Sequence, residues 1–190
     1  MRNAQVHFTK ITGPEPDGSG LLERVVYNMK FTMATQVDKA EILALYRSLV
    51  GTEYCAWTDE YPNETEIESD LSRNALFCMK DESGKIVGTI SIDDDEEVEK
   101  LSCWRDTLKP AGELSRLGVR REYQNQGLAR QLLQHGMEEL KRRGFKSVHF
   151  LVCKTNIKAI RSYGKLNFEV VGECRLFGEE WWCYEKTLIS

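Results

Sequence analysis

Residues 119–130 carry the side chains and spacing best suited to binding an anion. A predicted strand (113–119) leads into a turn and then into a helix that begins after Gly127. Such a junction directs unpaired backbone N–H groups at one point, where the helix dipole favours negative charge. Gly127 allows close approach of the backbone, and the small Ala129 leaves the ligand side open. Basic side chains lie nearby at Arg120, Arg121 and Arg130. The segment therefore predicts a phosphate site.

The two commonest phosphate-binding loops do not occur in the sequence. The pattern G-x-x-x-x-G-K-[ST] fails around Gly164 and Lys165, because Ala159 stands in place of the first glycine and Leu166 in place of Ser or Thr. The dinucleotide pattern G-x-G-x-x-G is also missing. The phosphate ligand must therefore be held by another kind of loop.

Two further motifs indicate which ligand this is. Gln124-x-x-Gly127-x-Ala129 resembles the pyrophosphate loop of the GNAT acetyltransferase superfamily, [Q/R]-x-x-G-x-[G/A] after a strand. The segment 156–168 resembles the second cofactor helix of that family, N-x-x-A-x-x-x-Y-x-K-x-G-F. Asn167 replaces the glycine of this pattern, and asparagine also tolerates the left-handed conformation of a helix end. Both motifs occur in the family's order.

The resemblance implies a fold and a reaction. The fold is α/β, with a mixed, mostly antiparallel sheet flanked by helices and splayed central strands that form the coenzyme A cleft. The reaction moves an acetyl group from acetyl-CoA to a primary amine by direct attack in a ternary complex, and no metal is expected. Such a reaction needs a base for the amine, a donor for the oxyanion and an acid for the leaving thiolate. The alternative is a catalytically silent CoA-binding sensor or regulatory module.

The resemblance also assigns roles to individual residues. Tyr163 has the position of the acid that protonates the CoA sulfur, although it could instead be a core residue of its helix. Glu113 has the position of a strand carboxylate that serves as the base in some members; a solvated strand end and a water chain without a dedicated base are the alternatives. The expected cofactor-binding residues are Leu117, Gly118 and Val119 on the strand, Gln124, Asn125, Gln126, Gly127, Leu128, Ala129 and Arg130 in the loop and helix start, and Asn156, which could also be a simple helix cap.

Charged and aromatic side chains outside the motifs could contribute to the acceptor side. The acidic run 93–97 either attracts a cationic amine or forms a solvated loop, and we favour the solvated loop. The aromatic residues Tyr54, Trp57 and Tyr61 either shape an amine pocket by cation–π contact or pack the first helices. By strand alternation Ser115 shares a face with Glu113 and could help to hold a water.

The remaining reactive side chains suggest structural roles. The histidines His7, His135 and His149 have no metal-ligand spacing, so a surface or core position is expected for each. Cys153 lies beside the expected thioester path, but we expect a core thiol there and not a covalent acceptor of the acetyl group.

The composition indicates one ordinary globular domain. The chain has 190 residues, of which 41% are hydrophobic and 29% charged. A net charge of −4 argues against a nucleic-acid partner. The six cysteines show no C-x-x-C pair, and no stretch approaches the ~18 apolar residues of a membrane span. We therefore expect a cytoplasmic protein whose partner is a small-molecule or peptide amine, with a homodimer as an option.

Local patterns outline the elements that must position these residues. Caps and helical apolar spacing predict helices at 35–50, 63–72, 128–143 and 156–166. Strands are predicted at 24–32, 75–80, 85–92, 113–119, 147–153, 168–174 and 181–188, with 93–99 as an acidic connection. Residues 1–24, rich in Gly, Pro and Ser at 13–20, are expected to be a flexible extension before a single domain at 25–190.

Overall fold

The computed structural model describes residues 29–188, which build a seven-stranded sheet in the order β1-β2-β3-β4-β5-β7-β6. Five of the neighbouring pairs are antiparallel, and β4 and β5 are parallel. The strands are β1 (Lys30–Met33), β2 (Leu76–Lys80), β3 (Ile86–Asp93), β4 (Ala111–Val119), β5 (Ser147–Cys153), β6 (Glu169–Leu176) and β7 (Glu179–Thr187). The prediction of a mixed, mostly antiparallel sheet is confirmed.

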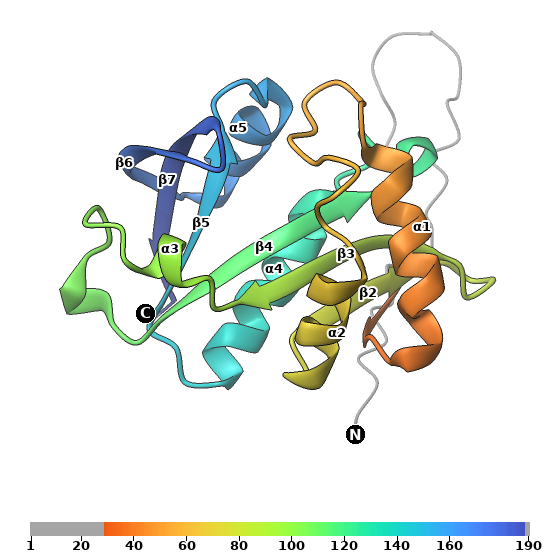
Figure 1. Cartoon of the computed structure of the whole chain (residues 1–190). Helices are drawn as coiled ribbons and strands as arrows, with labels where there is room; N and C mark the ends of the chain where they lie inside the picture. The colour runs from red at the N-terminus through yellow and green to blue at the C-terminus, as the bar shows by residue number, and fades with distance from the viewer. Residues whose placement is uncertain (1–28, 189–190) are drawn as a thin grey trace, which may run out of the picture.

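Helices cover both faces of this sheet (Figure 1). They are α1 (Lys39–Leu49), α2 (Glu64–Ser72), α3 (Glu96–Glu99), α4 (Leu128–Arg142) and α5 (Ile157–Tyr163), with short 3-10 turns at Gln36–Asp38, Asp106–Leu108, Arg121–Tyr123 and Gly164–Leu166. The helices α1 and α2 lie on one face, and α4 lies on the other (Figure 1). In the described part of the chain no helix is long and apolar enough to cross a membrane.

The helix starts follow signals that are visible in the sequence. Thr35 and Asp38 form a reciprocal capping box ahead of α1, and Asn63 forms one with Glu66 ahead of α2. Each box satisfies backbone N–H groups that have no partner inside the helix. The predicted starts of both helices are therefore confirmed, although the first turn at 36–38 is 3-10 and not α-helical.

Glycines let α4 and α1 approach the sheet closely. On α4, a Cβ at Gly136 would lie 2.8 Å from Leu114 of β4. On the opposite face, a Cβ at Gly118 would lie 2.9 Å from Trp57 and 3.0 Å from Leu49 of α1. Side-chain alternation along β4 thus sends Leu114 into the α4 core and leaves Glu113 on the face of α1 and α2.

The parallel strands β4 and β5 pair over only part of their length. Their register joins Ala111 to Ser147, Gly112 to Val148 and Glu113 to His149, and it stops there. Beyond this point the strands diverge (Figure 1). The register of β4 with β3 also shifts in this region, and Arg116 has φ +46°. Such a bulge bends a strand and re-aims its side chains. The predicted splay of the central strands is confirmed.

Some predicted elements are wrong in their extent or type. The acidic connection at 93–99 contains the short helix α3, whose start is capped by Asp95. The predicted helix 156–166 divides into α5 and a 3-10 turn, and Asn167 ends it in the left-handed conformation (φ +56°), as its sequence position suggested. The first strand begins at Lys30; its predicted residues 24–28, and the predicted extension 1–24, lie outside the described residues.

Candidate active site

The start of α4 has the geometry of an anion site. Asn125 (φ +61°) and Gly127 (φ +81°) turn the chain sharply after β4, and α4 begins at Leu128. The first N–H groups of a helix have no acceptor inside it. The Gln124 side chain fixes the loop by donating from Nε2 to the carbonyl of Val119 at 2.9 Å. The predicted strand, turn and helix at the phosphate segment are confirmed.

The basic residues of this segment differ in their availability. The Arg130 guanidinium lies over the helix start, 3.4 Å from the position that a Cβ on Gly127 would take. Arg120 instead donates from Nε to the carbonyl of Ile86 at 2.6 Å, and its Nη2 lies 3.5 Å from Glu41. Arg120 is therefore engaged with β3 and α1, whereas the Arg130 guanidinium lies near the helix start, and a charge contribution of either residue to a phosphate site stays a prediction.

Asn156 caps α5, which stands across the splay from α4. Its Oδ1 accepts a hydrogen bond from the N–H of Ala159 at 2.9 Å. The cap that the sequence offered as the simple alternative is thus present, and it leaves the Nδ2 group of Asn156 for another partner. A cofactor contact by Asn156 stays a prediction.

Tyr163 lies at the end of α5 and is 9% exposed. Its ring packs edge-on against Phe150 of β5, with the ring centroids 5.4 Å apart. Burial raises the pKa of the Tyr163 phenol to about 12, so the hydroxyl keeps its proton at neutral pH. The residue is both a core side chain and a phenol able to donate a proton.

Glu113 is the last β4 residue paired with β5, and it is only 4% exposed. Its Oε2 is buried and has no hydrogen-bond partner among residues 29–188. Burial first, and then the charge of Asp93, raise its pKa well above the usual value, while Arg116 acts in the opposite direction. Glu113 is thus not a solvated strand end, and a carboxyl with a raised pKa is suited to take up a proton near neutral pH.

A buried arginine network lies beside Glu113, and the sequence did not reveal it. Arg116 donates to Asp70 of α2 at 2.9 and 2.7 Å, to Asp93 at 2.6 Å and to the Tyr61 hydroxyl at 3.2 Å. Although burial lowers the pKa of Arg116, Asp93 and Asp70 raise it above its usual value. An arginine in the interior of a predicted strand was the available signal, because a buried charge needs a partner.

The acidic run 93–97 is engaged in structure. Beyond Asp93, Asp94 pairs with Arg73 at 3.1 Å, and Asp95 accepts the N–H groups of the first turn of α3. Glu96 and Glu97 pair with Lys100. These contacts favour the reading of a solvated structural loop over that of a steering surface.

The three candidate aromatic residues have separate neighbours. Trp57 packs edge-on against Tyr46 of α1 at 5.0 Å between centroids, which supports the packing alternative. Tyr61 belongs to the Arg116 network. The Nζ atom of Lys158, in α5, lies 5.5 Å from the centroid of the Tyr54 ring. This contact joins the α1–α2 connection to the helix that follows β5.

The other candidate side chains have the following contacts. Ser115 donates from Oγ to Asp93 at 2.9 Å, so this hydroxyl already has an acceptor. Cys153 lies 3.2 Å from the hydroxyl of Thr155, and His135 stacks on Phe31. His149 is fully buried, and the fold brings it close to Glu99 and Glu113, a cluster that sequence spacing did not predict. His7 lies outside the described residues.

Comparison with known families places the chain in one class. The sequence profile of the Acetyltransferase (GNAT) family matches residues 42–168. The chain therefore belongs to this family, whose members are acetyl-CoA-dependent acyltransferases, and the predicted family and co-substrate are confirmed at that level.

Individual relatives are more distant. The chain is 31% identical over 108 residues to a mycothiol acetyltransferase from Saccharomonospora viridis, a match that covers 57% of this chain and 34% of that relative. The chain thus spans about a third of the length of this curated relative. It also resembles yncA from Salmonella typhimurium, solved with acetyl-CoA (TM-score 0.67, 22% identity, 86% of this chain and 95% of that one). The ribosomal-protein-S18-alanine N-acetyltransferase of Escherichia coli is similar (TM-score 0.63, 18% identity, 84% and 94%).

Proposed function

We propose that this chain is an N-acetyltransferase that moves the acetyl group of acetyl-CoA to a primary amine by direct attack in a ternary complex. One observation carries the proposal: the open start of α4, with Gly127 and Arg130, follows the end of β4 that extends beyond its pairing with β5. Backbone N–H groups at a helix start and a guanidinium suit a pyrophosphate. The parting of the strands leaves the backbone of β4 beyond Glu113 without a β5 partner.

The residues present fit the binding of a coenzyme A chain. Residues 124–130 would hold the pyrophosphate, largely through main-chain N–H groups, and Arg130 would add a charge contact. Leu117, Gly118 and Val119 end β4 beyond its pairing with β5, so their backbone groups could bind the amides of the pantetheine arm. Asn156 would add a contact from the side of α5.

The proposed chemistry assigns one proton transfer to each of two residues. Glu113 takes a proton from the acceptor ammonium, and the neutral amine then attacks the thioester carbonyl. A backbone N–H near Val119 stabilises the oxyanion. When the C–S bond breaks, Tyr163 gives its phenolic proton to the sulfur. Both residues are buried, which excludes bulk water from these proton transfers.

The experiment that tests this function measures the release of the CoA thiol from acetyl-CoA in the presence of amines. The panel contains polyamines, aminoglycosides and peptides with free N-termini or lysines. We expect thiol release that depends on one class of amine and is lost in Glu113→Gln. A chain that binds CoA but releases no thiol with any amine would be the silent sensor instead.

A further inference from the structure

Five ionisable side chains form one row across the sheet. The strand registers pair Asp93 with Glu113, Glu113 with His149, His149 with Glu185, and Glu185 with Glu169. Residues directly opposite on neighbouring strands have their side chains on the same face. The row therefore crosses the sheet at the point where β4 and β5 part, with Glu113 and His149 on either side of that point.

The ends of the row have cationic partners and its centre has none in the described chain. The partners at the ends are Arg116 for Asp93, at 2.6 Å, and Arg105 for both Glu185 and Glu169. At the centre, Oε2 of Glu113 and both ring nitrogens of His149 are buried without a well-directed hydrogen bond within residues 29–188. A buried polar group left in this state is costly, so a function for the two central residues is expected.

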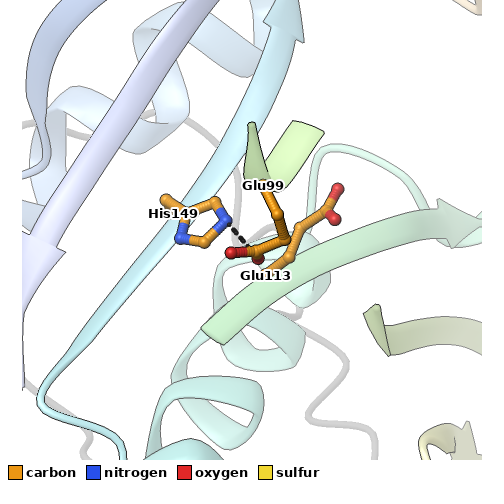
Figure 2. A group of neighbouring side chains, drawn as sticks. All are labelled: Glu99, Glu113 and His149. Carbon is orange, nitrogen blue, oxygen red and sulfur yellow. Dashed lines mark ion pairs between the residues drawn. The ribbon is translucent and has the colours of Figure 1, made fainter. Parts of the chain in front are cut away.

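Glu99 connects this centre to the surface. Its Oε1 lies 2.9 Å from Nε2 of His149, and its side chain is 39% exposed. Figure 2 shows the Glu99 side chain reaching from α3 to the imidazole, above the start of β4. One polar atom each of Glu99, Glu113 and His149 lies within 4.8 Å of the others. The ring of Trp104 covers the imidazole at 4.5 Å between centroids. The three groups form a short path from a buried carboxyl to solvent.

We propose that His149 and Glu99 carry the proton that Glu113 removes from the acceptor amine out to solvent. The proposal rests on the proposed function. An ammonium that becomes an amide loses two protons, and the CoA sulfur gains one, so each turnover releases one proton. The N–H bond of the acceptor amine breaks as an O–H bond forms on Glu113. The proton then passes from Glu113 to an imidazole nitrogen of His149, and from His149 to the Glu99 carboxylate. The separation of up to 4.8 Å between Glu113 and His149 is short enough for one water to bridge them.

The charged groups around Glu113 and His149 determine which ionisations a pH–rate profile would report. The charged groups that face Glu113 are Asp93, Asp95, Glu99 and Arg116, and those that face His149 are Glu99 and Glu185. Asp93, Arg116 and Glu185 are held in ion pairs, whereas Glu99 meets His149 and solvent. A neutral substitution at Glu99 therefore changes the exit of the proton and leaves the ion pairs of the row intact.

The test compares Glu99→Gln with Glu97→Gln, a control on the same helix that faces Lys100. We expect Glu99→Gln to lower kcat about tenfold at low buffer concentration, with an unchanged KM for acetyl-CoA, because proton exit slows and binding does not. A high concentration of a small buffer such as imidazole should restore kcat, since it collects the proton directly. Glu97→Gln should keep the parental kcat at every buffer concentration.

Three results would overturn the relay. The first is a Glu99→Gln variant with the parental kcat, pH profile and buffer dependence, while Glu113→Gln is slow. The second is the same parental behaviour in a folded His149→Gln variant. The third is activity lost with EDTA and restored by Zn²⁺, which would assign the cluster to a metal. If Glu113→Gln itself kept the parental rate, the proposed base would fail, and this is a separate outcome.

Discussion

Arg116 holds the fully buried carboxylate of Asp70 through two hydrogen bonds, and so it ties β4 to α2 beneath the candidate site. The same guanidinium reaches Asp93 at the end of β3. Three elements that are distant in sequence therefore depend on one side chain located in the bulge of β4. Glu113 lies three residues earlier on the same strand.

Arg116→Met should destabilise the fold strongly. The variant removes the buried cation and leaves the buried Asp70 with only Arg73 and Ser91 as side-chain partners among residues 29–188, and breaking a buried ion pair costs about 3–5 kcal/mol. The measurement is the free energy of unfolding in denaturant. Arg142→Met is the control, because Arg142 pairs with Glu139 on the exposed side of α4 and should matter little. Equal stability of the two variants would contradict the anchoring role.

The sequence predicted those features that depend on neighbouring residues. The caps at Thr35 and Asn63 and the turn at Gly127 act within a few positions, so their patterns were readable. The partners of Arg116 lie 46 and 23 positions away, and no local pattern encodes that distance. The pairing of Glu113 with His149 likewise depends on the register of two parallel strands, which only the folded sheet determines. The helix α3 was missed because its four residues are too few to show a period.

Gly127→Ala should weaken the binding of acetyl-CoA. A Cβ at φ +81° costs about 1–2 kcal/mol of backbone strain, and it would also meet the Arg130 guanidinium at 3.4 Å. We expect the KM for acetyl-CoA to rise about tenfold, which corresponds to ~1.4 kcal/mol, with a smaller change in kcat. Steady-state kinetics give both values.

Gly144→Ala is the matched control for this prediction. Gly144 has φ +90°, and nothing lies within 4 Å of its Cβ position, so the variant carries a similar strain away from the site. Both variants should lose thermal stability, but only Gly127→Ala should change the KM. An equal KM in the two variants would remove Gly127 from the cofactor site.

Tyr163→Phe should slow the chemical step. The variant keeps the ring that packs on Phe150 and removes the only proton that the phenol can donate. We expect kcat to fall about 100-fold, the KM for acetyl-CoA to stay within about threefold, and the fold to stay intact. Because the pKa of Tyr163 is about 12, its ionisation should leave no limb in the activity profile below pH 10.

Tyr184→Phe supplies the comparison for Tyr163. Tyr184 is also buried and stacks on the same Phe150, at 5.8 Å between centroids, but it lies on β7. Its loss should leave kcat near the parental value. If Tyr163→Phe also kept the parental rate, the phenol would have no part in the mechanism.

Glu113→Gln should have opposite effects on activity and on stability. The folded state raises the pKa of Glu113, mainly through burial, so the protonated form is favoured there. Its contribution to stability is present below the ordinary glutamate pKa and is lost as the pH rises through the raised pKa. Above that pH the folded protein carries a buried charge beside Asp93. A neutral glutamine removes this cost, and the free energy of unfolding at pH 8 should rise relative to that of the parent.

The raised pKa of Glu113 has the opposite consequence for activity. The base must be ionised to accept a proton, so the kcat of the parent should fall as the pH drops through the raised pKa, well above the range of an ordinary glutamate. Glu113→Gln should lower kcat by about 100-fold and flatten this limb. The checks are a pH–rate profile and denaturant unfolding at pH 5 and pH 8. If Glu113→Gln is inactive but more stable than the parent, Glu113 is a base whose burial destabilises the fold. If the variant is less stable than the parent, Glu113 is a structural residue.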